Sequence, residues 1–150
     1  MFISFFPQIL SGPIARGKQL LPQISKGNKF DYNNFKEGLL IMAWGFFQKM
    51  IIADRIAILV NTVYDNYTQY KGFQIAIATV LFGIQIYCDF CGYSNIAVGA
   101  ARVMGFKLIN NFDTPYFATS VTDFWRRWHI SLSTWFRDYL YIPLGGNRCS

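Results

Sequence analysis

An uncharged apolar run over residues 72–88, "GFQIAIATVLFGIQIYC", constrains the fold more than any other stretch of this chain. Asp89 is the only charged residue between Lys71 and Arg102. At about 1.5 Å per residue, a helix over residues 72–101 is long enough to cross a hydrocarbon layer about 30 Å thick. A composition of 53% hydrophobic and 15% charged residues is also more apolar than that of an average soluble domain. We therefore predict a membrane-spanning helix over residues 72–101.

Residues 38–63 form a second apolar segment, and this one contains charge. Ionisable groups in the middle of a membrane cost about 3 kcal/mol each unless they face protein or water. We therefore expect this span to be shielded, interfacial or broken. Its polar and ionisable residues are Gln48, Lys49, Asp54 and Arg55.

The opening residues 1–15 carry no charge, yet Pro7, Gly12 and Pro13 would interrupt a helix there. We expect a broken or re-entrant membrane segment. The start is unlike a cleavable signal peptide, because no basic residue precedes the apolar run and no small-residue cleavage pattern follows it. Together the apolar segments predict an all-α fold, a polytopic bundle of membrane helices.

The basic residues indicate an orientation in the membrane. A net charge of +6 could suggest nucleic-acid binding, but these charges are spread between apolar blocks and form no dense basic face, so we expect no nucleic-acid partner. Between Arg16 and Lys36, the loop between the first two apolar segments has five basic residues and one acidic residue, Asp31. By the positive-inside rule this loop is cytoplasmic. Its basic residues are Arg16, Lys18, Lys26, Lys29 and Lys36.

Cys88 and Cys91 form a C-x-x-C pair that could indicate a redox or zinc site in another setting. The sequence has no second such pair, and its only histidine, His129, is far along the chain. We interpret these cysteines as ordinary buried thiols. Phosphate-binding loops, dinucleotide-binding turns and nucleophile elbows are also missing from the sequence. We expect no metal site and no tightly bound cofactor.

Residues 124–146, "FWRRWHISLSTWFRDYLYIPLGG", gather three of the four tryptophans and the only histidine. Capping residues precede this stretch, and a proline and two glycines end it, which predicts a helix over residues 121–140. Its amphipathic pattern suits the bilayer interface. At helical spacing, one face carries Trp125, Trp128, Leu132, Trp135 and Tyr139, and an adjoining face carries Arg126, Ser133 and Arg137.

His129 allows a second interpretation of this segment. A neutral imidazole can take a proton from a hydroxyl near neutral pH, and arginines can hold the anionic part of a donor molecule. A single histidine does not decide between this chemistry and a purely structural anchor, so both interpretations stay open.

Three phrases of the sequence occur in an order that resembles a known family. They are "FFPQILSGPIARGKQLLPQ" (residues 5–23), "YCDFCGYSNIAVG" (residues 87–99) and "PYFATSVTDFWRRWHISLSTWFRDYLYIPLGGNR" (residues 115–148). Together they resemble the membrane-bound O-acyltransferase (MBOAT) family, and within it the bacterial branch that O-acetylates alginate or transfers D-alanine to teichoic acids. The resemblance covers effectively the whole chain.

The resemblance implies a many-helix enzyme with a tunnel, located in the bacterial inner membrane and crossing it several times. An acyl group, acetyl or D-alanyl, enters from a donor or acyl carrier on the cytoplasmic side. It passes to hydroxyls of an extracytoplasmic polysaccharide, directly or through a partner acyltransferase outside the cell. Alginate-type O-acetylation is the activity that we expect. The acyl donor is a substrate, and no other cofactor is implied.

The resemblance also implies which residues form the site. The accepted catalytic histidine of the family lies in a Trp-His-Gly motif downstream of the "GGNR" phrase, and residues 1–150 contain no such motif. We therefore expect this chain to be a central, incomplete part of one MBOAT domain, inactive alone. His129 matches the family's other recurrent histidine and is our candidate catalytic-site residue, in a supporting role that orients donor or acceptor. Residues expected to line the chamber or its cytoplasmic mouth are Asp89, Arg126, Arg127, Ser131, Ser133 and Asp138.

Two alternatives come from other classes of protein. A membrane transporter or channel could use charged residues of the apolar segments to line a pathway. A structural membrane-interface module would depend on the tryptophans and would not need His129. The pathway residues of the transport alternative are Lys49, Asp54, Arg55 and Asp89.

Overall fold

The computed structural model describes Pro7 and residues 12–146. Every regular element among these residues is helical, which confirms the all-α prediction for this part of the chain. The predicted broken segment over residues 1–15 lies mostly outside them, and residues 12–15 of it are non-helical. The α-helices are α2 (Gly17–Lys26), α3 (Tyr32–Phe46), α4 (Asp54–Asp65), α5 (Gly72–Val103), α6 (Val121–Arg127) and α7 (Ile130–Phe136), the π-helices are η1 (Phe47–Ala53) and η4 (Arg137–Tyr141), and the short 3-10 helices are η2 (Tyr67–Gln69) and η3 (Pro115–Phe117).

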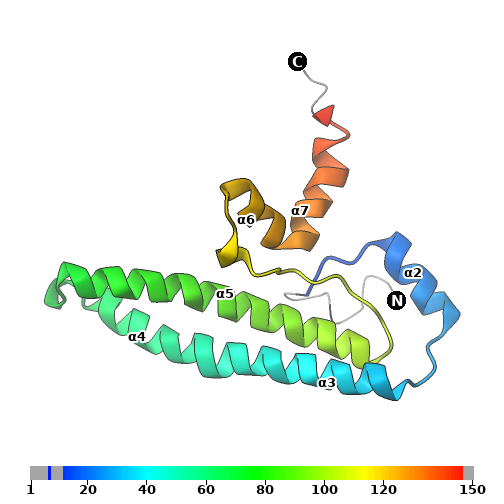
Figure 1. Cartoon of the computed structure of the whole chain (residues 1–150), viewed down its shortest axis with the longest axis horizontal. Coiled ribbons are helices and arrows are strands. Elements are labelled where there is room, and N and C mark those ends of the chain that lie inside the picture. Colours follow the sequence, from blue (N-terminus) through cyan, green and yellow to red (C-terminus); the bar gives the residue numbers. More distant parts are fainter. Residues whose placement is uncertain (1–6, 8–11, 147–150) are drawn as a thin grey trace.

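A long antiparallel hairpin dominates the fold (Figure 1). Helices α3, η1 and α4 follow one another without a break and pack along α5. Local capping sets the ends of the hairpin. Asp31 is the N-cap of α3, and its carboxylate accepts a hydrogen bond from the Asn33 N–H at 2.9 Å. Gly105, with a φ of 83°, ends α5 in a Schellman turn, in which the Phe106 N–H donates to the Ala101 carbonyl at 2.9 Å.

Helix α5 contains the whole predicted span 72–101. Among the described helices it is the one long and apolar enough to cross a membrane. Only 22% of its most apolar 18-residue stretch is buried inside the structure, so most of the apolar side chains of that stretch face outward. Helices α3, η1 and α4 contain the second predicted segment, 38–63, and extend it at both ends.

Two pairs of glycines let α3 and α5 touch backbone to backbone. A Cβ built on Gly38 would lie 2.8 Å from the Gly99 carbonyl oxygen, and one built on Gly45 would lie 2.7 Å from that of Gly92. Both distances are shorter than real Cβ contacts allow. Gly38 and Gly45 lie seven residues apart along α3, and Gly92 and Gly99 lie seven residues apart along α5. The same two faces therefore meet twice in one antiparallel register. Larger side chains at these positions would separate the helices.

Polar side chains pair across the same interface. Glu37 and Arg102 form an ion pair near its first glycine pair. Farther along, the Asn95 amide donates to the Gln48 side-chain oxygen at 2.7 Å. Gln48 is 6% exposed, so its hydrogen bond satisfies a buried polar group that would otherwise destabilise the hairpin.

The predicted continuous helix over residues 121–140 is wrong. The structure breaks it at Trp128 and His129, between α6 and α7, and its last part is the π-helix η4. Trp128 has extended backbone angles, and His129 has a left-handed φ of 45°. Because left-handed angles cost energy in any residue with a Cβ, interactions elsewhere must hold this break.

Candidate functional site at the break between α6 and α7

The segment that follows α5 holds the break in place. The Asp113 N–H donates to the Arg127 carbonyl at 3.0 Å, at the end of α6. The carbonyl of Asn111 accepts from the Ile130 N–H at 2.9 Å, and the Asn111 side-chain oxygen accepts from the Ser131 N–H at 3.3 Å. The first N–H groups of a helix have no partner within it. Asn111, which is 1% exposed, supplies those partners for α7 and makes the break a fixed feature.

An aromatic cluster attaches this segment to α5. Trp128 stacks on Phe124, with ring centroids 5.6 Å apart, and meets Phe112 edge to face at 5.0 Å. Its ring also lies 6.2 Å from Tyr87 and 6.4 Å from Phe90 of α5. Such aromatic pairs contribute about 0.5–1.5 kcal/mol each beyond the area that they bury. The cluster therefore places the break against the end of the uncharged run of α5.

His129 packs against the same helix. Its ring meets Phe90 edge on, with centroids 4.8 Å apart. Burial lowers the pKa of His129 below its ordinary value of 6.5, because a low-dielectric surrounding disfavours the charged imidazolium. The imidazole is therefore neutral at pH 7, the form that can accept a proton from a hydroxyl.

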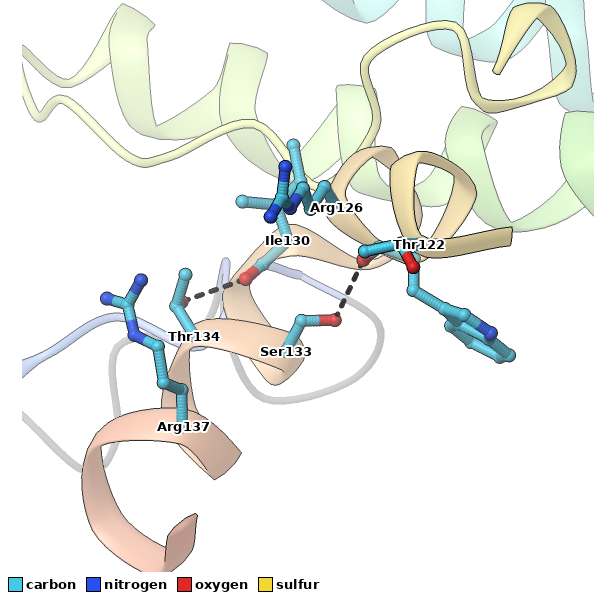
Figure 2. Close-up of a pocket in the computed structure, with 7 residues that line it drawn as sticks. Thr122, Arg126, Ile130, Ser133, Thr134 and Arg137 are labelled. Atoms are coloured by element: carbon cyan, nitrogen blue, oxygen red, sulfur yellow. Dashed lines mark hydrogen bonds between the residues drawn. The ribbon is translucent and has the colours of Figure 1, made fainter. Parts of the chain in front are cut away.

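An open pocket of about 750 Å³ lies beside the break (Figure 2). Its apolar lining comes from Trp125 and Ile130. The Ser133 hydroxyl lies 3.4 Å from the Trp125 carbonyl, and the Thr134 hydroxyl donates to the Ile130 carbonyl at 2.8 Å. His129 is absent from the lining residues. The polar lining residues are Thr122, Arg126, Ser133, Thr134 and Arg137.

The structure brings together two of the residues that we predicted to line a chamber. Arg126 and Ser133 both line the pocket. Arg127 instead pairs with Asp123 one turn earlier, its Nε lying 3.0 Å from the carboxylate. The Arg127 guanidinium thereby lowers the pKa of Asp123. Arg127 thus has a contact within α6 that explains its presence without a substrate.

Ser131 and Asp138 connect the break to the segment before α2. The Ser131 hydroxyl is buried and accepts a hydrogen bond from the Ile14 N–H at 3.0 Å. Asp138 forms ion pairs with Arg137 and Arg16. These two guanidiniums hold the pKa of the Asp138 carboxyl below its usual range. Both predicted residues therefore hold two distant parts of the chain together.

Asp89 lies neither in the pocket nor at the contact with the segment before α2. It belongs to an ion cluster between the hairpin helices, formed by Lys49, Asp54 and Asp89. The Lys49 ammonium lies 2.5 Å from an Asp89 oxygen and 2.8 Å from an Asp54 oxygen. The Asp54 N–H donates to the Lys49 carbonyl in the wide turn of η1, which places the two side chains near each other. The cluster offsets most of the charge that the apolar segment 38–63 carries. These charges pair with one another, which gives no support to the transport alternative.

Several pocket residues were missing from the predicted set. Thr122, Ile130 and Thr134 are among these missed residues, and together with the predicted Arg126 they repeat at intervals of four and line the pocket. That helical spacing is visible in the sequence and could have indicated a shared face. Arg137, one turn after Thr134, completes this row.

The two cysteines of the C-x-x-C pair are free thiols, as we interpreted them. Cys88 is 6% exposed and Cys91 is 5% exposed, both on the buried side of α5. The Asn95 amide lies 3.5 Å from the Cys91 sulfur. Among residues 7 and 12–146, no three His, Cys, Asp or Glu side chains come together in a way that could hold a metal ion.

Known proteins resemble this chain along its length. It is 42% identical over 150 residues to the peptidoglycan O-acetyltransferase of Helicobacter pylori, a match that covers 99% of this chain and 28% of that protein. It is 42% identical over 147 residues to the probable alginate O-acetylase AlgI of Pseudomonas putida, covering 98% and 30% of the two chains. The teichoic acid D-alanyltransferase of Bacillus subtilis is 35% identical over 152 residues, covering 94% of this chain and 36% of that protein.

The chain thus spans less than a third of the length of the first two of these relatives. A family model described as MBOAT, membrane-bound O-acyltransferase family, matches residues 1–150, the whole chain. The chain therefore belongs to the membrane-bound O-acyltransferase family.

Proposed function

We propose that this chain is part of a bacterial inner-membrane enzyme that transfers an acyl group to hydroxyls of an extracytoplasmic polysaccharide. The observation that carries the proposal is the family match over the whole chain, together with relatives whose names all describe acyl transfer to cell-surface polymers. The acetyl-transferring relatives are 42% identical and the D-alanyl-transferring one is 35% identical, which favours an acetyl group. Alginate-type O-acetylation is the reaction that we propose, with peptidoglycan as the other acceptor that an equally similar relative names.

The hairpin supports a polytopic arrangement. If α5 crosses the bilayer, α3 and α4 cross beside it in the opposite direction, because the two rods are antiparallel and of similar length. The start of α3 and the end of α5 then lie on the same side. Basic residues gather at this end, including Lys36, Arg102 and Lys107, which by the positive-inside rule makes it cytoplasmic. An acyl donor or acyl carrier would approach from this side, and the polysaccharide or a partner acyltransferase from the other.

His129 is our candidate for a supporting role in the reaction. Its neutral imidazole is suited to accept a proton or to orient a hydroxyl. Its left-handed backbone also sets the angle between α6 and α7, and so the shape of the pocket that Arg126 and Ser133 line. Asp89, Arg127, Ser131 and Asp138 act in this proposal by holding the site together.

The proposal can be tested in cells that lack the complete gene. We would measure ester-linked acyl groups on the extracytoplasmic polysaccharide after complementation with the wild type or with His129→Asn. Asparagine tolerates left-handed backbone angles, so the break should persist. We expect the wild type to restore the esters and His129→Asn to reduce them at least about tenfold, the lower range for a lost acid–base group.

Lys18→Gln is the matched control, because Lys18 is exposed on α2 and does not line the pocket. It should restore the esters fully at equal membrane abundance. If deletion of the gene leaves the ester content unchanged, the proposed function is wrong. If only His129→Asn behaves like the wild type, the function stands and the role of His129 is wrong.

A further inference from the structure

A second pocket, of about 460 Å³, adjoins the one beside the break and continues it along η4. The two share Ser133 and Arg137, so together they form one groove. The first part of the groove is polar and carries both arginines (Figure 2). The second part is apolar, lined chiefly by Phe136, Leu140, Tyr141 and Leu144.

The polar half of the groove has an excess of positive charge. No carboxylate among the described residues forms an ion pair with Arg126. Arg137 pairs with Asp138, with its Nε 2.8 Å from the carboxylate, but Arg16 also pairs with that carboxylate. Two guanidiniums, those of Arg16 and Arg137, therefore share one carboxylate. The Arg137 side chain is 61% exposed, so its other N–H groups can reach a ligand.

The segment that carries the groove packs on α5 where its uncharged run 72–88 ends. The aromatic cluster joins α6 and α7 to α5 at Tyr87 and Phe90, and the first charged residue of α5 is Asp89. The arginines thus belong to the segment that packs where charge first appears along α5, beside an apolar surface that is exposed in the described part of the chain.

We propose that the groove binds one anionic phospholipid, with its phosphate between Arg126 and Arg137 and an acyl chain along Leu140 and Tyr141. Guanidinium groups donate two parallel hydrogen bonds to phosphate oxygens. Leu140 is 49% exposed and Tyr141 is 50% exposed, and an alkyl chain would remove this apolar area from water. A zwitterionic lipid would leave the excess charge uncompensated, and a soluble phosphate ester would leave the apolar half uncovered. The groove includes the pocket of the proposed function, and its lipid binding can be measured independently of acyl transfer.

Native mass spectrometry of the complete protein in mild detergent tests this site. The protein is titrated with phosphatidylglycerol, and in separate arms with phosphatidylcholine and with glycerol 3-phosphate. We expect one tightly held phosphatidylglycerol and no comparable adduct in the other arms. Arg126→Gln and Arg137→Gln should each weaken binding about fivefold, the effect of one basic residue near an anionic surface. Arg126→Lys should retain most of the binding, and Leu140→Gln should weaken it without changing the preference for the anionic head group.

Lys18→Gln is again the control, since it removes one exposed positive charge outside the groove. It should bind phosphatidylglycerol like the wild type. Equal binding by Arg126→Gln and the wild type would overturn the proposal, as would an equal loss in Lys18→Gln. Displacement of the lipid by glycerol 3-phosphate at similar concentration would overturn it in favour of a soluble phosphate ligand.

Discussion

Replacing Gly99 by alanine should weaken the α3–α5 hairpin, because the added methyl group would meet the backbone of α3. The new Cβ would lie 2.6 Å from the Gly38 carbonyl oxygen and 2.8 Å from the Met42 nitrogen. Ordinary contact begins near 3.4 Å, so α3 must move away by about 0.8 Å at this point. Overpacking of this kind costs about 1–3 kcal/mol. A backbone obstacle cannot rotate aside as a side chain can, which places this substitution in the upper part of that range.

Alanine also favours the helical state over glycine by about 1 kcal/mol, which offsets part of the loss. We therefore expect Gly99→Ala to lower the free energy of unfolding by about 1–2 kcal/mol. The assay is unfolding of the complete purified protein in micelles by titration with dodecyl sulfate, followed by circular dichroism.

Gly83→Ala is the matched control on the same helix. Its Cβ would meet only the Tyr116 hydroxyl, at an ordinary 3.7 Å. With no clash to offset the helical preference of alanine, we expect it to raise stability by about 0.5–1 kcal/mol. A Gly99→Ala protein as stable as Gly83→Ala would refute the close backbone contact between α3 and α5.

Two further predictions concern charged groups. Lys49→Met should lower the free energy of unfolding by about 1–3 kcal/mol, because it leaves the Asp54 and Asp89 carboxylates without their cation. Adding Asp54→Asn and Asp89→Asn to this variant should recover most of the loss in the same micelle assay. If stability is not recovered, the ion cluster does not stabilise the hairpin. Burial lowers the pKa of His129. The free energy of unfolding should therefore fall as the pH drops below 6.5, because the imidazole then binds a proton in the unfolded protein but stays neutral in the folded one. His129→Asn should remove this dependence in unfolding measured from pH 8 to pH 5, and an unchanged pH profile would contradict the burial of the imidazole.

Helix α5 could be predicted from the sequence because its signal is local. Length, apolar character and lack of charge identify residues 72–101 without reference to any partner, and the helix found extends only to Val103. The glycine contacts could not be predicted in the same way. Gly38 and Gly99 are far apart in the chain, and only the antiparallel register brings their backbones together. The pairing of Lys49 with Asp89 depends on that same register.

The break at His129 escaped prediction because the helical spacing of residues continues across it. Trp125, Trp128 and Leu132 fit one helix face whether or not the helix is continuous. The interactions that fix the break come from Asn111, well before it in the chain. Arg126 and Ser133 were predicted from the family resemblance and lie together in the pocket. Ser131 and Asp138 were predicted in the same way, but they contact Ile14 and Arg16, which are distant in the chain, instead of lining the pocket.

The π-helix η1 changes the spacing of the buried residues along the rod that α3, η1 and α4 form. Before it, the buried Gly38 and Gly45 lie seven residues apart, and the buried Ala53, its last residue, and Val60 are again seven apart. From Gly45 to Ala53 the step is eight, so the chain carries one residue more than the repeat requires. A wide turn is the form in which a helix absorbs a single inserted residue and still presents one face to its partner. The π-helix η1 therefore takes up the extra residue, so that one face of this rod still meets α5 along its length.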